Sequence, residues 1–446
     1  MLKLIYRNLI AHRRRYFWIM LELCIAVFIS WKLLDKVIVN EYNRLSPLGY
    51  DIDRLVTFQF RELPSDAMPS GYEERDIDSK MADVIRIIDM VRDDSRVEAA
   101  TITGQYTFEK MGVWMNTIPK VTSDSAGEKN KVSINAFYIN FWRDTDFFKT
   151  FGLKDASGTN LADFEEQAMT KSQIIVSKSI AEFLFPGENA IGHSLFEKNG
   201  EEHKDGREMI VGIVNDAVYR SPSGRSPIVY KPRNNKDVER EGGVETLSGV
   251  IRLKEGVDMS AFIRDMKPKI EQDYRFGEIY CESLAPYNDM RERMARDVNN
   301  DNFIAKSIAL FFFVNILLCM TGTFYLQTRK RSEEAGVMRS FGASRGFIIR
   351  EMLGEGFAMV TLAWLCGCIL YWFFIHDSGL ADISFMGYDI TIVKQLMPLW
   401  YDDFLTHFAI VSLVIYIIML IAVMAGIYFP ARRISRISPI EALREE

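Results

Sequence analysis

Three long stretches of this sequence contain no charged residue, and they limit the possible folds more than any other feature. They run from Ile308 to Leu326, from Gly356 to Ile375 and from Phe408 to Phe429. A helix needs about 20 mostly apolar residues to cross the roughly 30 Å hydrocarbon core of a bilayer. Each stretch is therefore predicted to span a membrane.

A fourth candidate span, residues 16–34, is interrupted by Glu22 and Lys32. A charge in the middle of a span typically costs about 3 kcal/mol on insertion scales. The stretch could instead be a cleaved signal peptide, because it has a basic start and an apolar middle. No small-x-small cleavage site follows Trp31, so an uncleaved anchor is the preferred interpretation.

Basic residues in the short connecting segments predict the orientation of the spans. Residues 1–15 carry five Lys or Arg and no acid, and the segments after spans two and four are also basic. Residues 376–403, between spans three and four, hold one Lys against five Asp. We therefore expect a multi-pass protein of the bacterial inner membrane, with both termini cytoplasmic and the large domain in the periplasm.

The charged residues are concentrated between the first two spans. Residues 36–302 hold 36 Lys and Arg against 46 Asp and Glu, whereas the other 179 residues hold only 18 and 14. This partition predicts one large acidic domain in water. It excludes a purely soluble enzyme, a disordered chain and a strongly basic nucleic-acid binder. The domain contains a single cysteine, Cys281, so it has no internal disulfide and must be stabilised by packing.

The outer domain repeats one pattern near its two ends. Strand-like residues 53–60 and 97–106 flank a helical stretch, and residues 246–253 and 278–284 flank another, which Asp258 opens. We expect these two units to pack together as one α/β lobe, with the intervening residues forming a second lobe. The predicted fold has four transmembrane α-helices and a large two-lobed α/β extracytoplasmic domain inserted between spans 1 and 2.

Polar stretches 122–131 and 233–243 are predicted to be loops within the second lobe.

Helical character on both sides of the outer domain predicts that the first two spans continue outward as a stalk; two flexible tethers are the alternative. The expected segments are a cytoplasmic amphipathic helix (1–15), span one (16–34), a stalk (35–50), the split α/β lobe (51–109 and 246–286), the inserted β-rich lobe (110–245), a second stalk (287–302), span two (303–327), a cytoplasmic loop (328–350), span three (353–375), an outer loop (376–403), span four (404–430) and a cytoplasmic tail (431–446).

No set of catalytic residues stands out. The phosphate-binding pattern G-x-x-x-x-G-K-[ST] is absent, as are G-x-S-x-G and H-E-x-x-H. The histidines are dispersed and lack neighbours typical of metal ligands. They are His12, His193, His203, His376 and His407. We expect no catalytic residue, no metal and no bound cofactor, and therefore a non-catalytic membrane subunit.

Two carboxylates lie in or beside the predicted spans, Glu22 and Glu355. Ionisable groups inside a membrane are costly, so each has either a functional role or a partner. A proton or substrate site is one interpretation. Pairing with an Arg or Lys, or reaching the interface, is the preferred one.

The cytoplasmic segment after span two has strong helix signals. Ser332 can cap a helix whose first turn holds Glu333 and Glu334, as the helix dipole favours. Gly342 can end that helix in the C′ position, and Ser344 can cap the helix entering span three. The pattern predicts a short helix of about nine residues along the inner membrane surface.

Apolar side chains on this short helix need a partner. Val337, Met338 and Phe341 would not be required in a solvated loop, so we expect them to enter a groove in lipid or in another protein. The tail offers a further helix start, because Ser438, Pro439 and Glu441 match a capping box.

At this point the residues resemble a known family. The segment EEAGVMRSFGASRGFIIREMLGEG is similar to the coupling-helix segment of FtsX/MacB-type ABC transporter permeases, and IYFPARRISRISPIEALREE is similar to their C-terminal signature. The opening LIYRNLIAHRRRYF and parts of the outer domain also resemble the family. Glu333-Glu334-Ala335 departs from it, since Arg-Glu-Ile is more usual there. The resemblance implies that the ATPase-coupling residues are Glu333, Glu334, Gly336, Val337, Met338, Arg339, Phe341 and Gly342.

The resemblance also implies partners and a mechanism. Such permeases form a homodimer, or a heterodimer with a sister permease, and bind a separate ABC ATPase subunit that holds the ATP. ATP-driven closure moves the periplasmic domains through the stalk, which is called mechanotransmission. The implied role is MacB-like efflux of a peptide, toxin or small molecule, with a periplasmic adaptor and outer-membrane duct left open. The alternatives are a lipoprotein-releasing permease resembling LolC/LolE, an FtsX-like regulator of cell-wall hydrolases, and a receptor outside the ABC class.

Overall fold

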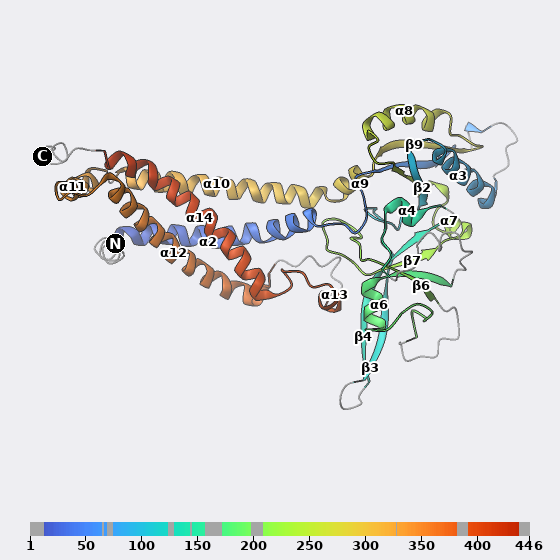
Figure 1. Cartoon of the computed structure of the whole chain (residues 1–446), viewed down its shortest axis with the longest axis horizontal. Coiled ribbons are helices and arrows are strands. Elements are labelled where there is room, and N and C mark those ends of the chain that lie inside the picture. The colour runs from blue at the N-terminus through green and yellow to red at the C-terminus, as the bar shows by residue number, and fades with distance from the viewer. Residues whose placement is uncertain are drawn as a thin grey trace. The chain divides into compact units, whose positions relative to one another are not determined.

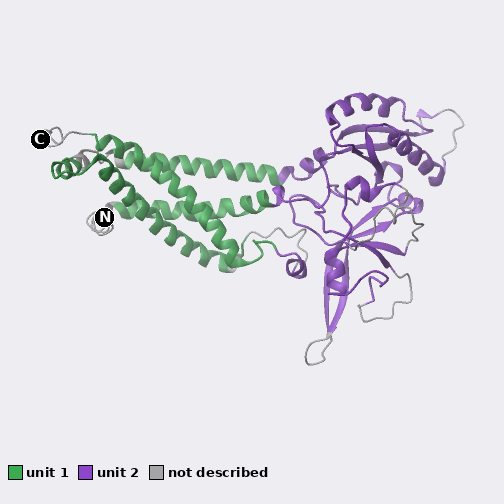
Figure 2. Ribbon diagram, in the orientation of Figure 1, with its two compact units in different colours: residues 1–42, 298–382, 399–446 green, residues 43–297, 383–398 purple. Residues whose placement is uncertain are grey.

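Two units make up the chain (Figure 2). The first, here called the helical unit, comprises residues 1–42, 298–382 and 399–446, and the second, the outer-domain unit, comprises residues 43–297 and 383–398. The amphipathic helix expected at the N-terminus falls largely outside the described residues, and so does the capping box of the tail. The computed structural model describes residues 13–64, 67–68, 75–123, 129–142, 145–156, 172–197, 208–326, 328–380 and 391–436.

Four helices among the described residues are long and apolar enough to cross a membrane. Their candidate spans are Tyr16–Leu45, Arg296–Thr323, Arg345–His376 and Phe404–Ile434. They belong to α2 (Arg13–Leu45), α10 (Arg296–Leu326), α12 (Arg345–Ser378) and α14 (Phe404–Ile434), labelled in Figure 1. With the α/β domain between the first two, they confirm the predicted fold class.

The first two spanning helices continue beyond their apolar parts. Helix α2 runs without a break to Leu45, because no Gly or Pro interrupts residues 35–45. Within the helical unit, Asn40 Nδ2 donates to Asn302 Oδ1 at 3.0 Å, and Glu41 pairs with Lys306 on α10. The extensions are therefore helical and joined by polar contacts, which flexible tethers would not be.

Close approach of the spanning helices depends on a small residue in α14. A Cβ atom added to Gly426 would lie 2.9 Å from the Leu317 carbonyl oxygen and 2.9 Å from the Met320 Cβ, both on α10. Small residues at such crossings let helix backbones pack closely where no hydrophobic effect drives association in lipid. Gly426 therefore sets the contact between the second and fourth spans.

The outer domain is built on one nine-stranded sheet in the order β6-β5-β7-β4-β2-β8-β1-β9, with β3 paired to β4. The two predicted strand–helix–strand units interleave as the antiparallel strands β2-β8-β1-β9. Alternate side chains of β1, Val56, Phe58 and Phe60, face the same core as helices α3 and α8. The units are β1 (Leu55–Glu62), α3 (Ile77–Arg92) and β2 (Val97–Thr103), then β8 (Ser248–Leu253), α8 (Met259–Gln272) and β9 (Ile279–Pro286).

The inserted residues continue the same sheet instead of forming a separate one. Thr103 of β2 pairs with Phe141 of β4, and this pairing joins the two halves. Alternation of apolar and polar residues identifies a strand but not the strands it pairs with, so this junction was not predicted. The inserted elements are β3 (Met115–Ser123), β4 (Lys129–Phe141), α4 (Phe147–Phe151), β5 (Gln173–Ser177), α6 (Lys178–Leu184), β6 (Met209–Val214), β7 (Ile228–Pro232), α7 (Asn235–Arg240) and η2 (Val244–Thr246).

The prediction of a loop over residues 233–243 is wrong. Helix α7 forms there because Asn234 caps it: its side chain accepts from the Asp237 backbone, and the Asp237 side chain accepts from the Asn234 backbone. This reciprocal capping box overrides the polar composition of the stretch. In the other predicted loop, β3 continues to Ser123 and β4 starts at Lys129, and the residues between lie outside the described ranges.

A short helix from the loop between spans three and four belongs to the outer-domain unit. Helix α13 (Thr391–Leu396) packs on α6 and β4 in the inserted lobe. Its side chains Ile392, Val393 and Leu396 contact the core that includes Ile134 and Ile180. The flanking helices α12 and α14 belong mostly to the helical unit, so the loop is a further covalent connection between the two units.

Candidate functional site

The predicted short helix after span two is helix α11 (Thr328–Ser340), and it starts earlier than expected. Ser332 lies inside the helix, so its prediction as N-cap is wrong. Arg329 and Lys330 are strong helix formers, and no Gly or Pro stands between them and Ser332. The helix therefore extends back to Thr328.

The predicted end of α11 is confirmed. The Gly342 amide donates to the Arg339 carbonyl at 2.9 Å, and the Ala343 amide donates to the Met338 carbonyl at 3.0 Å. This is the Schellman pattern, in which the C′ residue adopts a left-handed conformation. Gly342 has φ +91°, which glycine adopts without steric cost.

The next helix begins as predicted, at a cap formed by Ser344. The Ser344 Oγ accepts from the Phe347 amide at 3.2 Å, and α12 starts at Arg345. Only two residues, Ala343 and Ser344, therefore separate the Gly342 terminus from the start of a spanning helix. Such a short connection limits how far α11 can move without moving α12.

Two of the predicted coupling residues on α11 and a third directly after its end share one exposed face. Glu333, Val337 and Phe341 are four residues apart, and positions at this spacing line one side of a helix. The Val337 side chain is 45% exposed and that of Phe341 is 87% exposed. We call Glu333, Val337 and Phe341 the exposed stripe of α11.

The other predicted coupling residues lie elsewhere. Gly336 is buried next to Ala335, where α11 packs against α14, and Met338 and Arg339 are half-buried. Gly342 forms the helix end described above, and the side chain of Glu334 is outside the described part of the chain. Helix α11 thus has a small buried face at Ala335 and Gly336, which anchors it, and a mostly apolar face that is exposed.

Each of the two carboxylates in or beside the spans accepts a hydrogen bond from another spanning helix. Glu355 is fully buried, and its Oε2 accepts from the Tyr16 hydroxyl at 3.2 Å. The Cys319 thiol donates to Glu22 Oε2 at 3.1 Å. Glu22 also lines a groove of about 520 Å³ between α2 and α10, whose walls are mostly apolar.

One pair of buried polar side chains was not predicted from the sequence. His407 at the start of α14 contacts Asp35 on α2, although the two residues are 372 positions apart. Asp35 directly follows the first apolar stretch and His407 directly precedes the last, which is the one sequence signal that could have suggested a pairing. Among the described residues, no group of three or more His, Cys, Asp and Glu could hold a metal ion.

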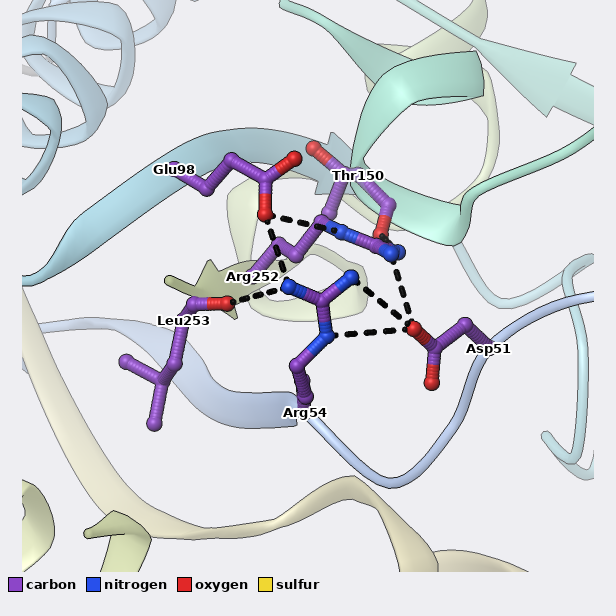
Figure 3. Close-up of polar contacts among 6 residues, drawn as sticks. All are labelled: Asp51, Arg54, Glu98, Thr150, Arg252 and Leu253. Atoms are coloured by element: carbon purple, nitrogen blue, oxygen red, sulfur yellow. Dashed lines mark hydrogen bonds and ion pairs between the residues drawn. The ribbon is translucent and has the colours of Figure 1, made fainter. Parts of the chain in front are cut away.

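A charged cluster in the outer domain joins the segment after α2 to the sheet (Figure 3). Asp51 Oδ2 lies 2.7 Å from Arg252 Nη2 on β8, and Arg54 Nη1 lies 3.0 Å from Glu98 Oε2 on β2. Arg252 also donates to the Thr150 carbonyl at 3.1 Å, at the end of α4. The first connection from the membrane is therefore tied to strands of the split lobe and to a helix of the insert.

Two adjacent ionisable groups, Glu109 and Lys110, are buried elsewhere in the outer domain. Burial raises the pKa of Glu109, although hydrogen bonds from the Ser221 hydroxyl and amide and from Tyr50 partly oppose the effect. Burial lowers the pKa of Lys110 to about 7. Lys110 Nζ donates to the Thr103 and Ser248 hydroxyls at 3.0 and 2.9 Å.

Comparisons with known proteins match both parts of the chain. Residues 48–269 match the MacB-like periplasmic core domain, and residues 306–439 match the FtsX-like permease C-terminal family. The macrolide export ATP-binding/permease protein MacB of Agrobacterium fabrum is 22% identical over 332 residues, which cover 74% of this chain. The chain spans 46% of the length of that relative.

Two solved structures are also similar to the chain. The periplasmic region of MacB from Actinobacillus actinomycetemcomitans has a TM-score of 0.30 and 11% identity, and the match covers 56% of this chain and 95% of that one. The extracellular domain of the noncanonic ABC-type transporter YknZ from Gram-positive bacteria has a TM-score of 0.25 and 12% identity, covering 51% and 100%.

Proposed function

Since the chain belongs to the FtsX/MacB-type ABC transporter permeases, we propose that it is the membrane subunit of a MacB-like mechanotransmission system. In this role it couples ATP hydrolysis on the cytoplasmic side to motion of its periplasmic domain. The transported substrate is a peptide, toxin or small molecule expelled from the periplasm. The subunit sits in the inner membrane with both termini cytoplasmic.

The observation that carries the proposal is the exposed stripe of α11. An exposed phenylalanine next to a valine and a carboxylate, at the fixed C-terminal end of a helix, suits a groove in another protein better than water. The MacB relative is an ATP-binding/permease protein, whereas this sequence has no phosphate-binding G-x-x-x-x-G-K-[ST] pattern. We therefore assign ATP binding to a partner ATPase subunit that receives the stripe.

Coupling requires that the ATPase favour one arrangement of the spans over another. A ligand shifts a conformational equilibrium only by its difference in affinity for the two states. Helix α11 is joined to α12 by the Gly342 end and the Ser344 cap, and it packs against α14 through Ala335. A shift of α11 would thus be passed to the last two spans at once.

We further place the subunit in a dimer, either with a second copy or with a sister permease. Helix α10 supports this, because only 11% of its most apolar window is buried within one chain. A periplasmic adaptor and an outer-membrane duct would complete an efflux route. Neither the dimer nor these partners follow from one chain, so each is part of the proposal.

Substitutions on α11 test the proposal directly. Phe341→Asp should abolish co-purification of the ATPase, because the mostly exposed side chain can be changed without loss of packing inside the chain. Phe341→Leu keeps an apolar side chain and should retain at least half of the bound ATPase. Glu334→Lys and Met338→Asp should uncouple ATPase activity from motion of the outer domain.

The readout is ATPase recovery and outer-domain motion, the latter followed by a fluorescent pair on that domain in nanodiscs. Membrane insertion of every variant is checked by the yield of folded protein in detergent. Full ATPase binding and coupling in Phe341→Asp, Glu334→Lys and Met338→Asp would contradict the assignment of α11 as the coupling helix.

A further inference from the structure

A buried pair of polar side chains links the first and last spanning helices. His407 is 0% exposed and Asp35 is 5% exposed. His407 Nε2 lies 2.7 Å from Asp35 Oδ1, and His407 Nδ1 lies 3.1 Å from the carbonyl oxygen of Tyr401. Both ring nitrogens are thus engaged, and the two contacts together fix the orientation of the ring.

These two contacts determine how many protons the pair holds. A carbonyl oxygen can only accept, so Nδ1 must carry a hydrogen and donate to Tyr401. The contact between Nε2 and Oδ1 needs a second proton, because an unprotonated ring nitrogen and a carboxylate are both acceptors. That proton lies either on Nε2, giving imidazolium and carboxylate, or on Asp35, giving imidazole and carboxylic acid.

Both forms have no net charge, which suits the surroundings. Trp400 packs edge-on against His407 with ring centroids 5.2 Å apart. Trp31, one turn before Asp35 and fully buried, is stacked between Tyr371 at 4.7 Å and Phe408 at 4.9 Å. A pair without net charge costs less to bury among these rings than a pair that carries a net charge.

We infer that Asp35 and His407 share a bound proton and that this proton holds α2 to the start of α14. Loss of the proton would place two acceptors at 2.7 Å, so the contact would open. The pair therefore acts as a proton-dependent clasp at the outer end of the spanning helices. It acts in addition to the proposed coupling through α11 and does not depend on an ATPase partner.

Other titratable groups approach the clasp from each neighbouring element. Tyr371 on α12 interacts electrostatically with Asp35, and Tyr401 precedes α14. Asp403 caps α14 and accepts from the Thr406 amide at 2.8 Å, and Lys32 on α2 lies over the Phe374 ring. Among the described contacts of His407, Asp35 is the acid within hydrogen-bond distance of the imidazole.

Nitrogen NMR of the full chain in nanodiscs tests the inference. A variant with the other four histidines changed to Gln leaves His407 as the sole labelled ring. At pH 7 we expect Nδ1 to be protonated, together with either a protonated Nε2 or an infrared band from a protonated Asp35 carboxyl. In this variant Asp35 and His407 themselves are unchanged. A ring with an unprotonated Nδ1, or a neutral ring beside an ionised Asp35, would overturn the inference.

The variant Asp35→Asn provides the matched comparison. Its amide can donate to an unprotonated Nε2, so the contact should persist with a neutral His407 and without the shared proton. We expect the imidazolium or carboxylic acid signature to disappear while Nδ1 stays protonated. Asp35→Ala should release the ring and lower the thermal midpoint further than Asp35→Asn. Unchanged His407 signals in Asp35→Asn would count against the shared proton, as would equal midpoints for the two variants.

Discussion

Lys110 shows at the residue scale how burial changes the chemistry of one side chain. It lies beside Glu109, which is also buried, yet its amine donates to two hydroxyls and the pKa of the amine falls to about 7. The unfolded chain keeps the ordinary lysine pKa, so between pH 7 and 10.5 it binds more protons than the folded chain. Stability of the outer domain should therefore rise with pH in this window.

The corresponding prediction compares Lys110→Met with the unchanged chain. Between pH 7 and 9 the unchanged chain should gain about 2 kcal/mol in free energy of unfolding from this group, and the variant should lack that gain. Denaturant unfolding of the purified chain in detergent, followed by tryptophan fluorescence, measures the difference. An equal pH dependence in both proteins would mean that Lys110 is not desolvated as the structure implies.

Gly249 of β8 is a second residue whose identity is set by a neighbour. It is paired with Phe58 on β1, and an added Cβ would lie 2.2 Å from the Phe58 ring. Gly249→Ala should destabilise the outer domain by about 1–3 kcal/mol, since overpacking forces neighbouring side chains to shift. Phe58→Leu should relieve the clash. The double variant should therefore lose less free energy of unfolding than the sum of the losses in the two single variants. Additive losses would rule out a direct clash.

At the scale of elements, the short helices α11 and α13 have opposite surroundings. Helix α11 was expected from its sequence, and its end and the next cap were found where Gly342 and Ser344 predicted them. Helix α13 was not expected, because six residues carry too little periodicity to separate a helix from an apolar loop. Its helical form depends on packing against the inserted lobe.

We predict that this packing can be removed selectively. Leu396→Asp places a charge against the core under α13, whereas Gln395→Asp changes an exposed neighbour on the same helix. The first should increase hydrogen exchange in α13 and α6 at least tenfold, and the second should leave it unchanged. Equal exchange in both variants would show that α13 is not held by its apolar face.

At the scale of the whole chain, the predicted orientation can be tested by labelling. After replacement of the native cysteines, a cysteine introduced at Gln395 should react with a membrane-impermeant maleimide once the outer membrane is permeabilised. A cysteine at Ser340, which is also exposed, should react only after the inner membrane is opened. The reverse pattern would place the termini outside and contradict the distribution of basic residues.

The number of membrane spans, the α/β character of the outer domain and the helix boundaries at Gly342 and Ser344 were predictable from the sequence, because they depend on local properties. A charge-free stretch of 20 residues partitions into lipid whatever surrounds it, and Gly342 ends a helix through its own backbone freedom. The start of α11 was predicted wrongly because Ser332 is a good cap only where the preceding residues do not favour helix.

The contacts that join distant segments were decided by folding in three dimensions. Thr103 and Phe141 merge two halves into one sheet, α13 docks on the insert, and His407 meets Asp35 across 372 positions. Such pairs leave no periodic pattern, since each side chain alone is compatible with several neighbours. Their partners are determined by which buried surfaces fit together. Burial then strengthens the effect of a shared proton or of a packed leucine on stability, because water no longer competes for the contact.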